Sequence, residues 1–457
     1  MGARKTTLGK EVARLLQRPF VDVDHAIAAE HGPIPELFAR QGEPAFREIE
    51  ARFVRDALAR PEPKVIAVGG GAVETPGLLR DERATVVHLL VDVETAWERV
   101  RRSSRPLAQD EVEFRRRFEL RAPLYPEAAD ATARDVDDLV LAAAGVHVER
   151  GALRRLGELL PGEGPAALVS DPHVAGIHGM DAQLALGARL AGRHELPPGE
   201  EAKTLAAVDR LWQELRLDRG GTIVALGGGC TTDAAGFAAA TYLRGVAWTP
   251  VPTSLVAQVD AAIGGKAAID LPQGKNLVGA FHWPDRTVVD PAVLGTLPEP
   301  QRLEGMAEVV KAGLLANEPL WELADDELVR RSAAYKAAIC LRDPFEQGER
   351  AVLNLGHTFA HALEAAAGYE GLTHGRAVAL GLLAALRLSG RDTQVVEDVL
   401  RPEPARVDAE RAWQAMRRDK KARGGELRLV LLGARGPEHG VVVPEADVRR
   451  ELDRLIA

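Results

Sequence analysis

The chain has 457 residues, of which 46% are hydrophobic and 27% charged, and its formal net charge at pH 7 is -9. This composition is typical of globular proteins and excludes a largely disordered chain. At roughly 100–200 residues per domain, the length predicts two to four domains. The acidic balance argues against broad nucleic-acid binding, which needs a basic face.

No stretch approaches the ~20 consecutive apolar residues of a membrane helix, and residues 1–12 lack the apolar core of a secretory signal. Cys230 and Cys340 are the only cysteines, which excludes a disulfide scaffold and fits a reducing compartment. We therefore expect a cytoplasmic protein with neither a membrane nor a nucleic acid as partner.

Apolar strands alternate with helical segments over the first third of the chain. Strands are predicted at 19–23, 64–68 and 85–91, and an amphipathic helix at 43–58. Strands separated by helices indicate a parallel sheet. The pattern resets near Gly145, where we place a domain boundary.

The first residues are similar to the end of a phosphate-binding loop, G-x-x-x-x-G-K-[ST]. In such a loop, backbone N–H groups at a helix N-terminus bind phosphates, Lys5 meets the β/γ charge and Thr6 holds Mg²⁺. Two departures are visible: the first glycine and its strand would precede Met1, and Arg4 stands where the last glycine belongs. The predicted nucleotide contacts are Gly2, Ala3, Arg4, Lys5, Thr6 and Thr7.

Acidic, glycine and arginine positions follow at intervals. Asp24 follows the first strand, Gly70 lies in the Gly-Gly-Gly run after the second, and arginines occur at 47, 105 and 121. Together they predict a site for a polyhydroxylated carboxylate, with Asp24 on hydroxyls and Arg47 and Arg121 on the carboxylate.

In the order and spacing of these residues, positions 1–144 resemble shikimate kinase with its first strand missing. The resemblance implies a P-loop kinase-like parallel sheet and ATP-dependent phosphorylation of shikimate. It places Lys5 on the nucleotide, Thr6 and Asp22 at Mg²⁺, and Arg105 on a lid. Shikimate would contact Asp24, the expected base, together with Arg47, Gly70 and Arg121. A degenerate kinase kept as a folding or docking partner is the alternative that the altered loop leaves open.

The chain from 145 to 300 is again of α/β type, and from 301 to 457 it is mainly helical. Strands are predicted at 166–170 and 222–226, the second running into Gly227-Gly228-Gly229 before an Ala-rich helix beginning near Ala234. Such a turn can bind a dinucleotide pyrophosphate on backbone amides. A late strand is predicted at 427–432.

Potential metal ligands gather in the helical part. His357 and His361 lie at i and i+4 on one helical face, His374 follows, and Glu308 and Lys311 share a face of an earlier helix. Two neutral imidazoles and one carboxylate form a credible Zn²⁺ site with an open position, suited to polarising a hydroxyl or carbonyl oxygen.

With these motifs, residues 145–457 resemble 3-dehydroquinate synthase. The family converts 3-deoxy-D-arabino-heptulosonate 7-phosphate into 3-dehydroquinate and phosphate, using NAD⁺ and a divalent metal, Zn²⁺ or Co²⁺. A ring alcohol is oxidised, phosphate is eliminated, the ketone is reduced again, and the ring opens and recloses. The chain would thus be a lyase and a kinase of aromatic amino acid biosynthesis, and the family suggests a homodimer.

The resemblance assigns site residues one by one. Glu308, His357 and His374 would hold the metal, and His361, Lys311 and Asp260 would take part in catalysis. Substrate would contact Asn276, Lys336, Arg350, Asn354 and Lys421 (or its neighbour Lys420). The cofactor side would comprise Glu200, Lys203, Gly229, Cys230, Thr231, Thr232, Asp233, Thr253, Ser254, Lys266, Lys275, Val293, Leu294, Gly295 and Thr296, with Asp171 as a further candidate for ribose.

The chain departs from the family pattern at a few positions. Thr232 and Ala360 replace glycines, and Ser254 replaces a threonine while keeping the hydroxyl. Arg376 follows His374-Gly375 where an acid is usual, and the sequence leaves open whether it repels the metal or turns toward phosphate.

Two rival functions share parts of this pattern. Other sugar-phosphate cyclases use the same NAD⁺ and metal machinery on different sugar phosphates, but the adjoining kinase-like module favours one shared pathway. A metal-dependent alcohol dehydrogenase would produce net NADH and gives no reason for so many lysines near the metal ligands.

Overall fold

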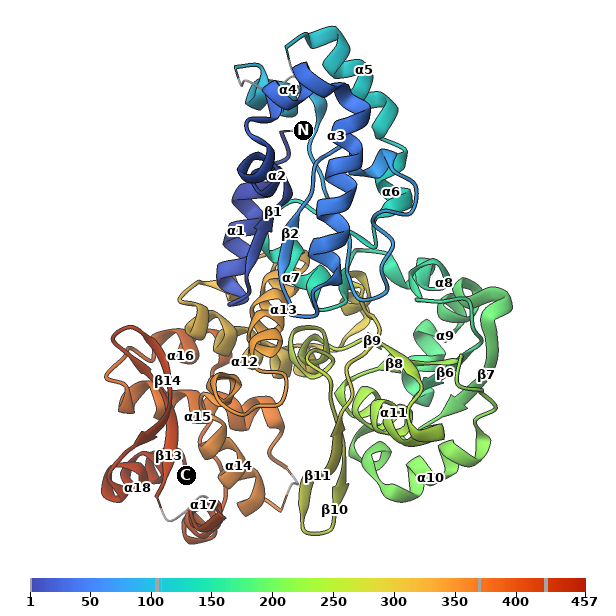
Figure 1. The fold of residues 1–457 in the computed structure, drawn as a ribbon. Coiled ribbons are helices and arrows are strands. Elements are labelled where there is room, and N and C mark those ends of the chain that lie inside the picture. Colours follow the sequence, from blue (N-terminus) through green and yellow to red (C-terminus); the bar gives the residue numbers. More distant parts are fainter. Residues whose placement is uncertain (1, 103–106, 108, 369–370, 423–425) are drawn as a thin grey trace. The chain divides into compact units, whose positions relative to one another are not determined.

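The computed structural model describes residues 2–102, 107, 109–368, 371–422 and 426–457, with backbone only at 419–422. The chain divides into two compact units, an N-terminal unit of residues 1–144 and a C-terminal unit of residues 145–457 (Figure 1). No described helix is both long enough and apolar enough to cross a lipid bilayer.

The N-terminal unit alternates strands and helices as predicted. Its elements are α1 (Lys5–Leu15), β1 (Phe20–Asp22), α2 (Val23–His31), α3 (Ile34–Ala59), β2 (Val65–Ala67), β3 (Val87–Leu89), α4 (Val93–Val100), α5 (Glu111–Arg121), α6 (Leu124–Ala128), β4 (Ala131–Ala133) and α7 (Val136–Ala143). β1 pairs with β2 and β3 with β4, both in parallel. The predicted parallel sheet is therefore present as two separate parallel pairs among the described residues.

Helix α3 is interrupted near a glycine and a proline in its sequence. Gly42 has a φ of 78°, outside the helical region, and Pro44 follows inside the helix. Proline removes a backbone donor and clashes with the preceding turn, so a kink at this point is expected. The break lies one residue before Glu43 and one turn before Arg47, two residues of the site described below.

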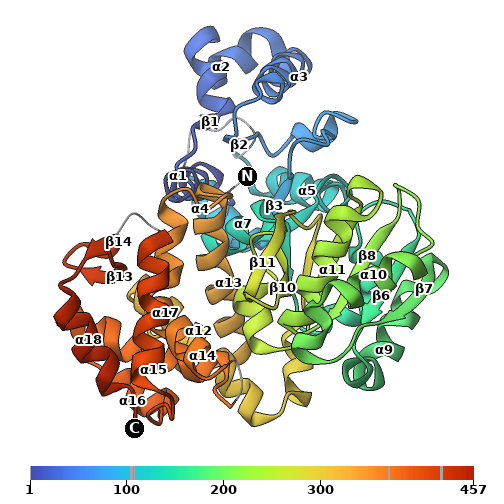
Figure 2. The same ribbon diagram turned by 90° about the horizontal axis from the view of Figure 1, so that it is seen from below.

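The C-terminal unit begins with a four-stranded parallel sheet of order β7-β6-β8-β9 (Figures 1 and 2). Its elements are β5 (Val146–Val148), α8 (Leu156–Leu159), β6 (Ala166–Ser170), α9 (Pro172–Leu186), β7 (Leu190–Glu195), α10 (Leu205–Glu214), β8 (Thr222–Gly227), α11 (Gly229–Thr241), β9 (Ala247–Pro252), β10 (Lys266–Leu271), β11 (Gly274–Phe281) and β12 (Thr287–Val289). β10 and β11 form an antiparallel hairpin, and β12 pairs in parallel with β5.

The central strands of this sheet are buried on both faces. Along β8, Ile223 and Ala225 pack in a cluster with residues of α10 and α11, whereas Val224 and Leu226 pack in a second cluster with residues of α8 and α9. Because successive side chains of a strand point to opposite faces, this division shows helices on both sides. It explains why the strand lacks polar–apolar alternation in the sequence.

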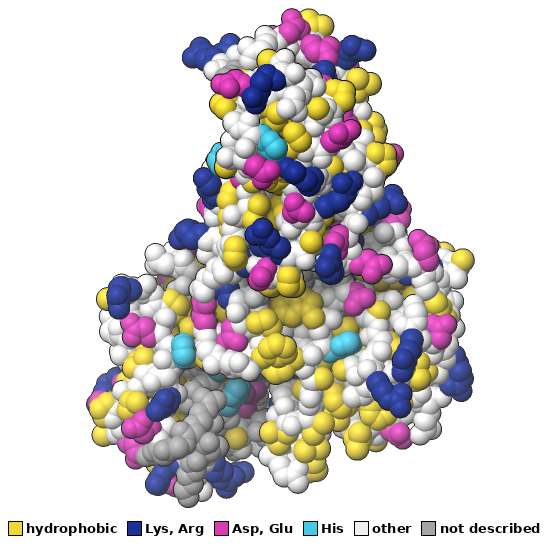
Figure 3. All heavy atoms as spheres, in the orientation of Figure 1, with side chains coloured by type: hydrophobic (Ala, Val, Ile, Leu, Met, Phe, Trp, Pro, Cys, Tyr) yellow, Lys and Arg dark blue, Asp and Glu magenta, His cyan; other side chains and the backbone are white. Residues whose placement is uncertain are grey.

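Helices dominate the rest of the C-terminal unit and share one core. The elements are α12 (Glu299–Ala316), α13 (Asp325–Arg342), α14 (His357–Ala366), α15 (His374–Leu388), α16 (Gln394–Leu400), α17 (Ala409–Ala422), β13 (Arg428–Gly433), β14 (Gly436–Val442) and α18 (Glu445–Arg454). On the face shown in Figure 3, acidic and basic side chains lie interspersed over the described residues. A division of this unit at residue 300 stays a prediction.

Candidate active sites

The first site residues lie around the start of α1. No side chain of the described residues caps this helix, and Thr6 Oγ1 donates a hydrogen bond to Asp22 Oδ2 at 2.6 Å. The hydroxyl and carboxylate predicted to serve Mg²⁺ are thus together, at the end of β1. Arg4 has a φ of 60°, in the left-handed region that favours glycine.

The other predicted loop residues differ in exposure. Gly2 also has a positive φ, and a Cβ atom there would lie 2.5 Å from the carbonyl oxygen of Ala96, so only glycine fits. Ala3 is half-buried, whereas Thr7 is exposed on the first turn of α1. Arg105, predicted on a lid, lies outside the described residues.

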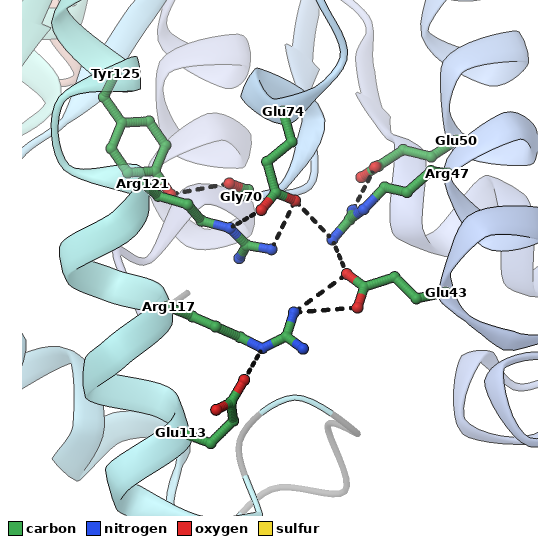
Figure 4. Close-up of polar contacts among 9 residues, drawn as sticks. All are labelled: Glu43, Arg47, Glu50, Gly70, Glu74, Glu113, Arg117, Arg121 and Tyr125. Atoms are coloured by element: carbon green, nitrogen blue, oxygen red, sulfur yellow. Dashed lines mark hydrogen bonds and ion pairs between the residues drawn. The ribbon is translucent and has the colours of Figure 1, made fainter.

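A cluster of arginine and glutamate side chains fills the second part of this site (Figure 4). Arg47, on α3, donates to Glu50 at 2.6 Å and to Glu43 at 2.9 Å. A Cβ atom at Gly71 would overlap the Arg47 guanidinium, and one at Gly69 would overlap the Glu50 carboxylate. The glycine run after β2 therefore lets this ion pair lie against the backbone. Burial raises the pKa of Glu50 more than Arg47 lowers it.

Arg121, at the end of α5, is buried and forms two hydrogen bonds with Glu74, at 3.1 and 3.0 Å. Tyr125 donates to the carbonyl oxygen of Gly70 at 2.9 Å. Arg117, one turn before Arg121, bonds both Glu43 and Glu113. The cluster thus joins α3, α5 and the turn after β2.

The structure brings Arg47, Arg121 and Gly70 together as predicted. Asp24 lies beside them, as its contact with the glycine run shows: a Cβ atom built at Gly69 would be 3.6 Å from Asp24 Oδ1. Sequence reasoning missed Glu43, Glu74, Arg117 and Tyr125. Only the i, i+4 spacing of Glu43 and Arg47 offered a signal in the sequence.

In the C-terminal unit, predicted cofactor residues follow the carboxyl ends of the sheet strands. Asp171 follows β6, Gly228 follows β8, and Thr253 follows β9. β6 and β8 are adjacent, and the chain continues from β6 to one side of the sheet and from β8 to the other. In parallel α/β sheets, ligands bind outside the carboxyl ends at such a point of reversal.

The turn between β8 and α11 is suited to an anionic ligand. α11 begins at Gly229, five residues before the predicted start, and its N-cap residue, Gly228, provides no side chain. Ser254 Oγ is buried without a hydrogen-bond partner among the described residues and lies near Gly228. An uncapped helix N-terminus beside an unsatisfied hydroxyl fits a pyrophosphate. Thr231 packs against Gly227, and Thr232 Oγ1 donates to the carbonyl oxygen of Gly229.

A charged network lies next to this turn. Lys203 Nζ donates to Asp233 at 2.7 Å and also bonds the side-chain oxygen of Asn276, and Lys275 pairs with Glu200 at 2.6 Å. These predicted cofactor and substrate residues are therefore adjacent. Burial, reinforced by the nearby carboxylates, raises the pKa of the Cys230 thiol to about 12.

Other predicted cofactor residues have structural contacts. Asp171 caps α9 by accepting from the amides of His173 and Val174, both at 3.0 Å. Val293 and Leu294 are buried, whereas Gly295 is exposed, and Thr296 Oγ1 is 2.8 Å from His178 Nε2.

Glu308, His357 and His374 converge as predicted. One ligand atom from each lies within 4.8 Å of the others, and both imidazole Nε2 atoms are 3.6 Å from Glu308 Oε1. Two ligands about 2.0–2.1 Å from a tetrahedral metal lie about 3.3 Å apart. Both Glu308 oxygens are buried without a well-formed hydrogen bond among the described residues. The donor set therefore fits a divalent cation, with a carboxylate that forms an ion pair with Lys311 but no well-formed hydrogen bond.

Close backbone packing brings the two histidine helices together. His357 begins α14 and His374 begins α15. A Cβ atom at Gly381, on α15, would overlap the carbonyl oxygen of Gly356, which itself has a φ of 79°. Glu304, one turn before Glu308 on α12, accepts a 2.6 Å bond from the amide of Gly375. These contacts fix the three ligand-bearing helices relative to one another.

The remaining ring nitrogens of both histidines are also held. His357 Nδ1 is 3.2 Å from the carbonyl oxygen of Leu355, and His374 Nδ1 is 3.4 Å from Glu364 Oε1. Such contacts orient imidazoles toward a metal. Sequence reasoning missed Glu364, which is buried on the helix of His357, seven residues later.

The pKa values in this centre are strongly shifted. Burial lowers the pKa of His357 to about 3, with Lys311 contributing, so its ring is neutral and ready to ligate. Burial also opposes the charge of His374, but the nearby carboxylates of Glu308 and Glu364 outweigh this effect and raise the pKa of His374 to about 10. Burial raises the pKa of Glu308, yet Lys311 and the histidines hold it well below its usual value.

A chain of alternating charges extends from the metal ligands. Lys311 Nζ is in ion-pair contact with Glu308 and lies 4.0 Å from Asp260 Oδ1. Lys336 Nζ lies 2.8 Å from the same Asp260 oxygen and also donates to the Asp260 carbonyl. Burial alone would lower the pKa of Lys311, but the carboxylates of Glu308 and Asp260 raise it by more than burial lowers it. The pKa therefore lies above its usual value, and the ammonium stays charged.

Other predicted substrate residues contact an acid that sequence reasoning missed. Glu346 pairs with Lys266 and accepts a 3.2 Å hydrogen bond from Asn354. It lies four residues before Arg350, a spacing that gave the only signal. Arg350 is buried and donates to the carbonyl oxygen of Gly264 at 2.9 Å.

His361 and Arg376 complete the surroundings. The ring of His361 is exposed, with its centre 5.5 Å from that of His357. Arg376 pairs with Glu403 at 3.4 Å, both side chains being substantially exposed. Among the described residues, this ion-pair partner of Arg376 is neither a predicted metal ligand nor a predicted substrate residue. The side chains of Lys420 and Lys421, on α17, lie outside the described part.

Three family models match the chain. The model described as shikimate kinase covers residues 1–144, and those described as 3-dehydroquinate synthase N-terminal and C-terminal cover residues 193–304 and 305–422. The 3-dehydroquinate synthase of Bordetella pertussis is 40% identical over 341 residues, covering 68% of this chain and 95% of that enzyme. That of Gloeobacter violaceus is 42% identical over 347 residues, covering 68% and 96%.

Solved structures resemble the C-terminal unit. A 2-deoxy-scyllo-inosose synthase complexed with carbaglucose-6-phosphate, NAD⁺ and Co²⁺ has a TM-score of 0.61 at 26% identity, covering 68% of this chain and 96% of that one. A 2-epi-5-epi-valiolone synthase from Streptomyces hygroscopicus, with NAD⁺ and Zn²⁺ bound, has a TM-score of 0.58 at 23% identity with the same coverage and shows a shared fold.

The family models and the fold define a fusion of a P-loop-type kinase domain with a lyase built on a parallel α/β sheet. The chain belongs to the 3-dehydroquinate synthase family. It is a 3-dehydroquinate synthase of the shikimate pathway, which forms 3-dehydroquinate and phosphate from 3-deoxy-D-arabino-heptulosonate 7-phosphate, fused to a shikimate kinase domain. The resemblances inferred from the sequence and the predicted fold class are confirmed.

Proposed function

We propose that Glu308, His357 and His374 hold a divalent cation, Zn²⁺ or Co²⁺, and that the turn between β8 and α11 binds NAD⁺. The convergence of the three ligand atoms within 4.8 Å carries this proposal. A related cyclase is complexed with NAD⁺ and Co²⁺. When bound, the two groups supply a hydride acceptor and polarisation of the hydroxyl that is oxidised.

Lys311 would stabilise negative charge on the substrate oxygen at the metal centre. Its ammonium stays charged because Glu308 and Asp260 raise its pKa against the effect of burial. A buried cation held between two carboxylates is pre-oriented, so it stabilises a developing oxyanion without reorganisation. Asp260 in turn holds Lys336 beside the same pocket.

The phosphate and carboxylate of the substrate require several cations. Lys266 and Asn354 meet at Glu346, Lys336 lies on Asp260, and Arg350 is buried against the carbonyl oxygen of Gly264. We assign these residues, with Asn276, to binding of the anionic groups. Lys421 is assigned with them on the family resemblance alone.

His361 would transfer protons rather than bind metal. It lies one turn after His357 with an exposed ring, and the three predicted ligands converge without it. Histidine is the side chain that most often serves as a general acid or base.

Metal content and turnover separate these two roles. His357→Ala should abolish both bound Zn²⁺ and phosphate release, whereas His361→Ala should keep Zn²⁺ and lose most turnover. Metal analysis of the purified chain and phosphate release from the heptulosonate phosphate provide the readouts. Full metal occupancy in His357→Ala, or metal loss in His361→Ala, would contradict the assignment.

The N-terminal unit would bind ATP and Mg²⁺ at the start of α1 and shikimate at the arginine cluster. The bond between Thr6 and Asp22 supports the Mg²⁺ site, and Arg47, Arg121 and Asp24 support the shikimate site. ATP-dependent formation of shikimate 3-phosphate, followed by mass spectrometry, tests this activity. Asp24→Asn should lose it, and Arg4→Gly should keep or increase it, since glycine suits the backbone at residue 4. If neither wild type nor Arg4→Gly turns over, the folding or docking role is favoured.

We also propose a homodimer in the cytoplasm. Ile177, Met180 and Leu184 form an exposed apolar stripe on α9, which supports self-association. The two free cysteines are compatible with a reducing compartment. Light scattering of the purified chain tests the dimer, and replacement of Leu184 by Lys should weaken it.

A further inference from the structure

One carboxylate of the N-terminal unit bridges the two arginines assigned to the substrate carboxylate. Glu74 accepts hydrogen bonds from Nε and Nη2 of Arg121 at 3.1 and 3.0 Å. Its Oε2 is also 3.4 Å from Nη2 of Arg47. Figure 4 shows Glu74 lying between the two guanidinium groups.

This arrangement is the one a carboxylate ligand would adopt. A guanidinium binds a carboxylate best through two parallel N–H···O bonds, and Glu74 already makes this pair of bonds to Arg121. A substrate carboxylate cannot occupy the same N–H groups while Glu74 stays there.

The charges of the cluster also oppose an added anion. The arginines drawn in Figure 4 (Arg47, Arg117 and Arg121) face more carboxylates than there are guanidinium groups: Glu43, Glu50, Glu74 and Glu113, with Asp24 beside them. A substrate carboxylate would increase this excess of negative charge unless one glutamate left. Displacement of one glutamate would restore the original balance.

Glu74 is the glutamate placed to leave. Its side chain is 39% exposed, against 1% for Glu50 and 30% for Glu43. Glu113 is 44% exposed, but it bonds Arg117 and neither of the two arginines assigned to the substrate carboxylate. It ends a three-residue turn, Ala72–Glu74, that follows the glycine run. Arg121, by contrast, is only 4% exposed and needs an anionic partner in the empty site, because a buried unpaired cation is costly.

We propose that Glu74 is a competing carboxylate: it neutralises Arg121 while the shikimate site is empty and is displaced by the substrate carboxylate. The proposal rests on the assignment of Arg47 and Arg121 to shikimate. Glu74 thus sets the affinity of the site and its preference for ligands that can replace a carboxylate.

Binding of shikimate to the full chain, measured by calorimetry without ATP, tests this proposal. Glu74→Ala should lower the dissociation constant about tenfold relative to wild type, which is the scale of one charge-assisted bond pair at a partly exposed site. Glu74→Gln keeps the size of the side chain and should give a smaller gain in the same direction. Glu98→Gln, which removes an exposed carboxylate paired with Arg101, is the matched control and should change nothing.

The methyl ester of shikimate shows whether the gain concerns charge. It lacks the anionic group, so Glu74→Ala should not improve its binding. Equal or weaker shikimate binding by both Glu74 variants would overturn the proposal. So would an equal gain for the acid and the ester, which would indicate a simple steric effect.

Arg121→Ala distinguishes failure of this inference from failure of the underlying assignment. If Arg121→Ala abolishes binding while the Glu74 variants bind like wild type, only the competing role is wrong. If Arg121→Ala binds like wild type, or if no variant binds shikimate, the assignment of the site is wrong and the competing role falls with it.

Discussion

Replacement of Glu364 by Gln should weaken metal binding although Glu364 is not a ligand. Its Oε1 lies 3.4 Å from Nδ1 of His374, and its side chain is 6% exposed. Removal of a residue that hydrogen-bonds a metal ligand typically lowers metal affinity 10- to 100-fold, or about 1.4–2.7 kcal/mol. Because the contact is long, we expect a loss of about tenfold.

Competition with a chromogenic chelator at pH 7.5 measures the Zn²⁺ affinity of each variant. Glu403→Gln is the matched control, because Glu403 is an exposed carboxylate of the same unit that pairs with Arg376. It should leave the affinity unchanged. If Glu364→Gln binds Zn²⁺ with wild-type affinity, the reasoning is refuted. It is also refuted if the loss of Zn²⁺ affinity is explained by a lower midpoint of unfolding of the variant.

Three further predictions concern packing, thiol chemistry and the departure at Arg376. In denaturant titrations, Gly381→Ala should lower the free energy of unfolding by about 1–3 kcal/mol or more, because the added Cβ would overlap the carbonyl oxygen of Gly356. Gly176 has open space around it, so Gly176→Ala should not lower the free energy of unfolding. The rate at which iodoacetamide alkylates Cys230, followed by peptide mass spectrometry, should rise about tenfold per pH unit from pH 8 to 10, because a pKa of about 12 leaves the thiol mostly protonated in this range. A rate that levels off near pH 9 would contradict this. Bound NAD⁺ should slow the reaction. Arg376→Ala should keep Zn²⁺ affinity within about twofold of wild type, since its guanidinium pairs with a surface acid.

The sequence predicted the strands that position the sites, and physical reasons explain this success. β6 and β8 are short apolar runs bounded by turn residues, because both faces of the sheet are covered. The predicted start of α11, near Ala234, lies five residues after its observed start at Gly229. Glycine is a poor helix former inside a helix, but Gly228 is tolerated as an N-cap and Gly229 in the first turn.

The convergence of the three proposed metal ligands could be predicted from the sequence, whereas the residues that contact them could not. Glu308, His357 and His374 stand out by residue type and helical spacing. Glu364 and Glu346 contact their partners only after helices and loops pack together. Apart from the four-residue spacing between Glu346 and Arg350, nothing in the local sequence distinguishes them from surface acids.

The same limit applies to the N-terminal unit. Arg47 and Arg121 were predicted as ligands of a substrate carboxylate, but their present partner, Glu74, is 47 residues from Arg121 in the sequence. Periodicity and short motifs report on residues within a few turns of one another. A competing charge supplied by a distant turn is visible only in the folded chain.

We expect this one chain to oxidise its substrate, eliminate phosphate, reduce the ketone and reclose the ring without net consumption of NAD⁺. Incubation of the purified full chain with 3-deoxy-D-arabino-heptulosonate 7-phosphate, NAD⁺ and Zn²⁺ tests it most directly, with phosphate, 3-dehydroquinate and NADH measured together. We predict phosphate and 3-dehydroquinate in equal amounts, with no accumulation of NADH. Phosphate without 3-dehydroquinate would indicate another cyclase, and NADH formed in step with substrate loss would indicate a dehydrogenase; either result would contradict the account.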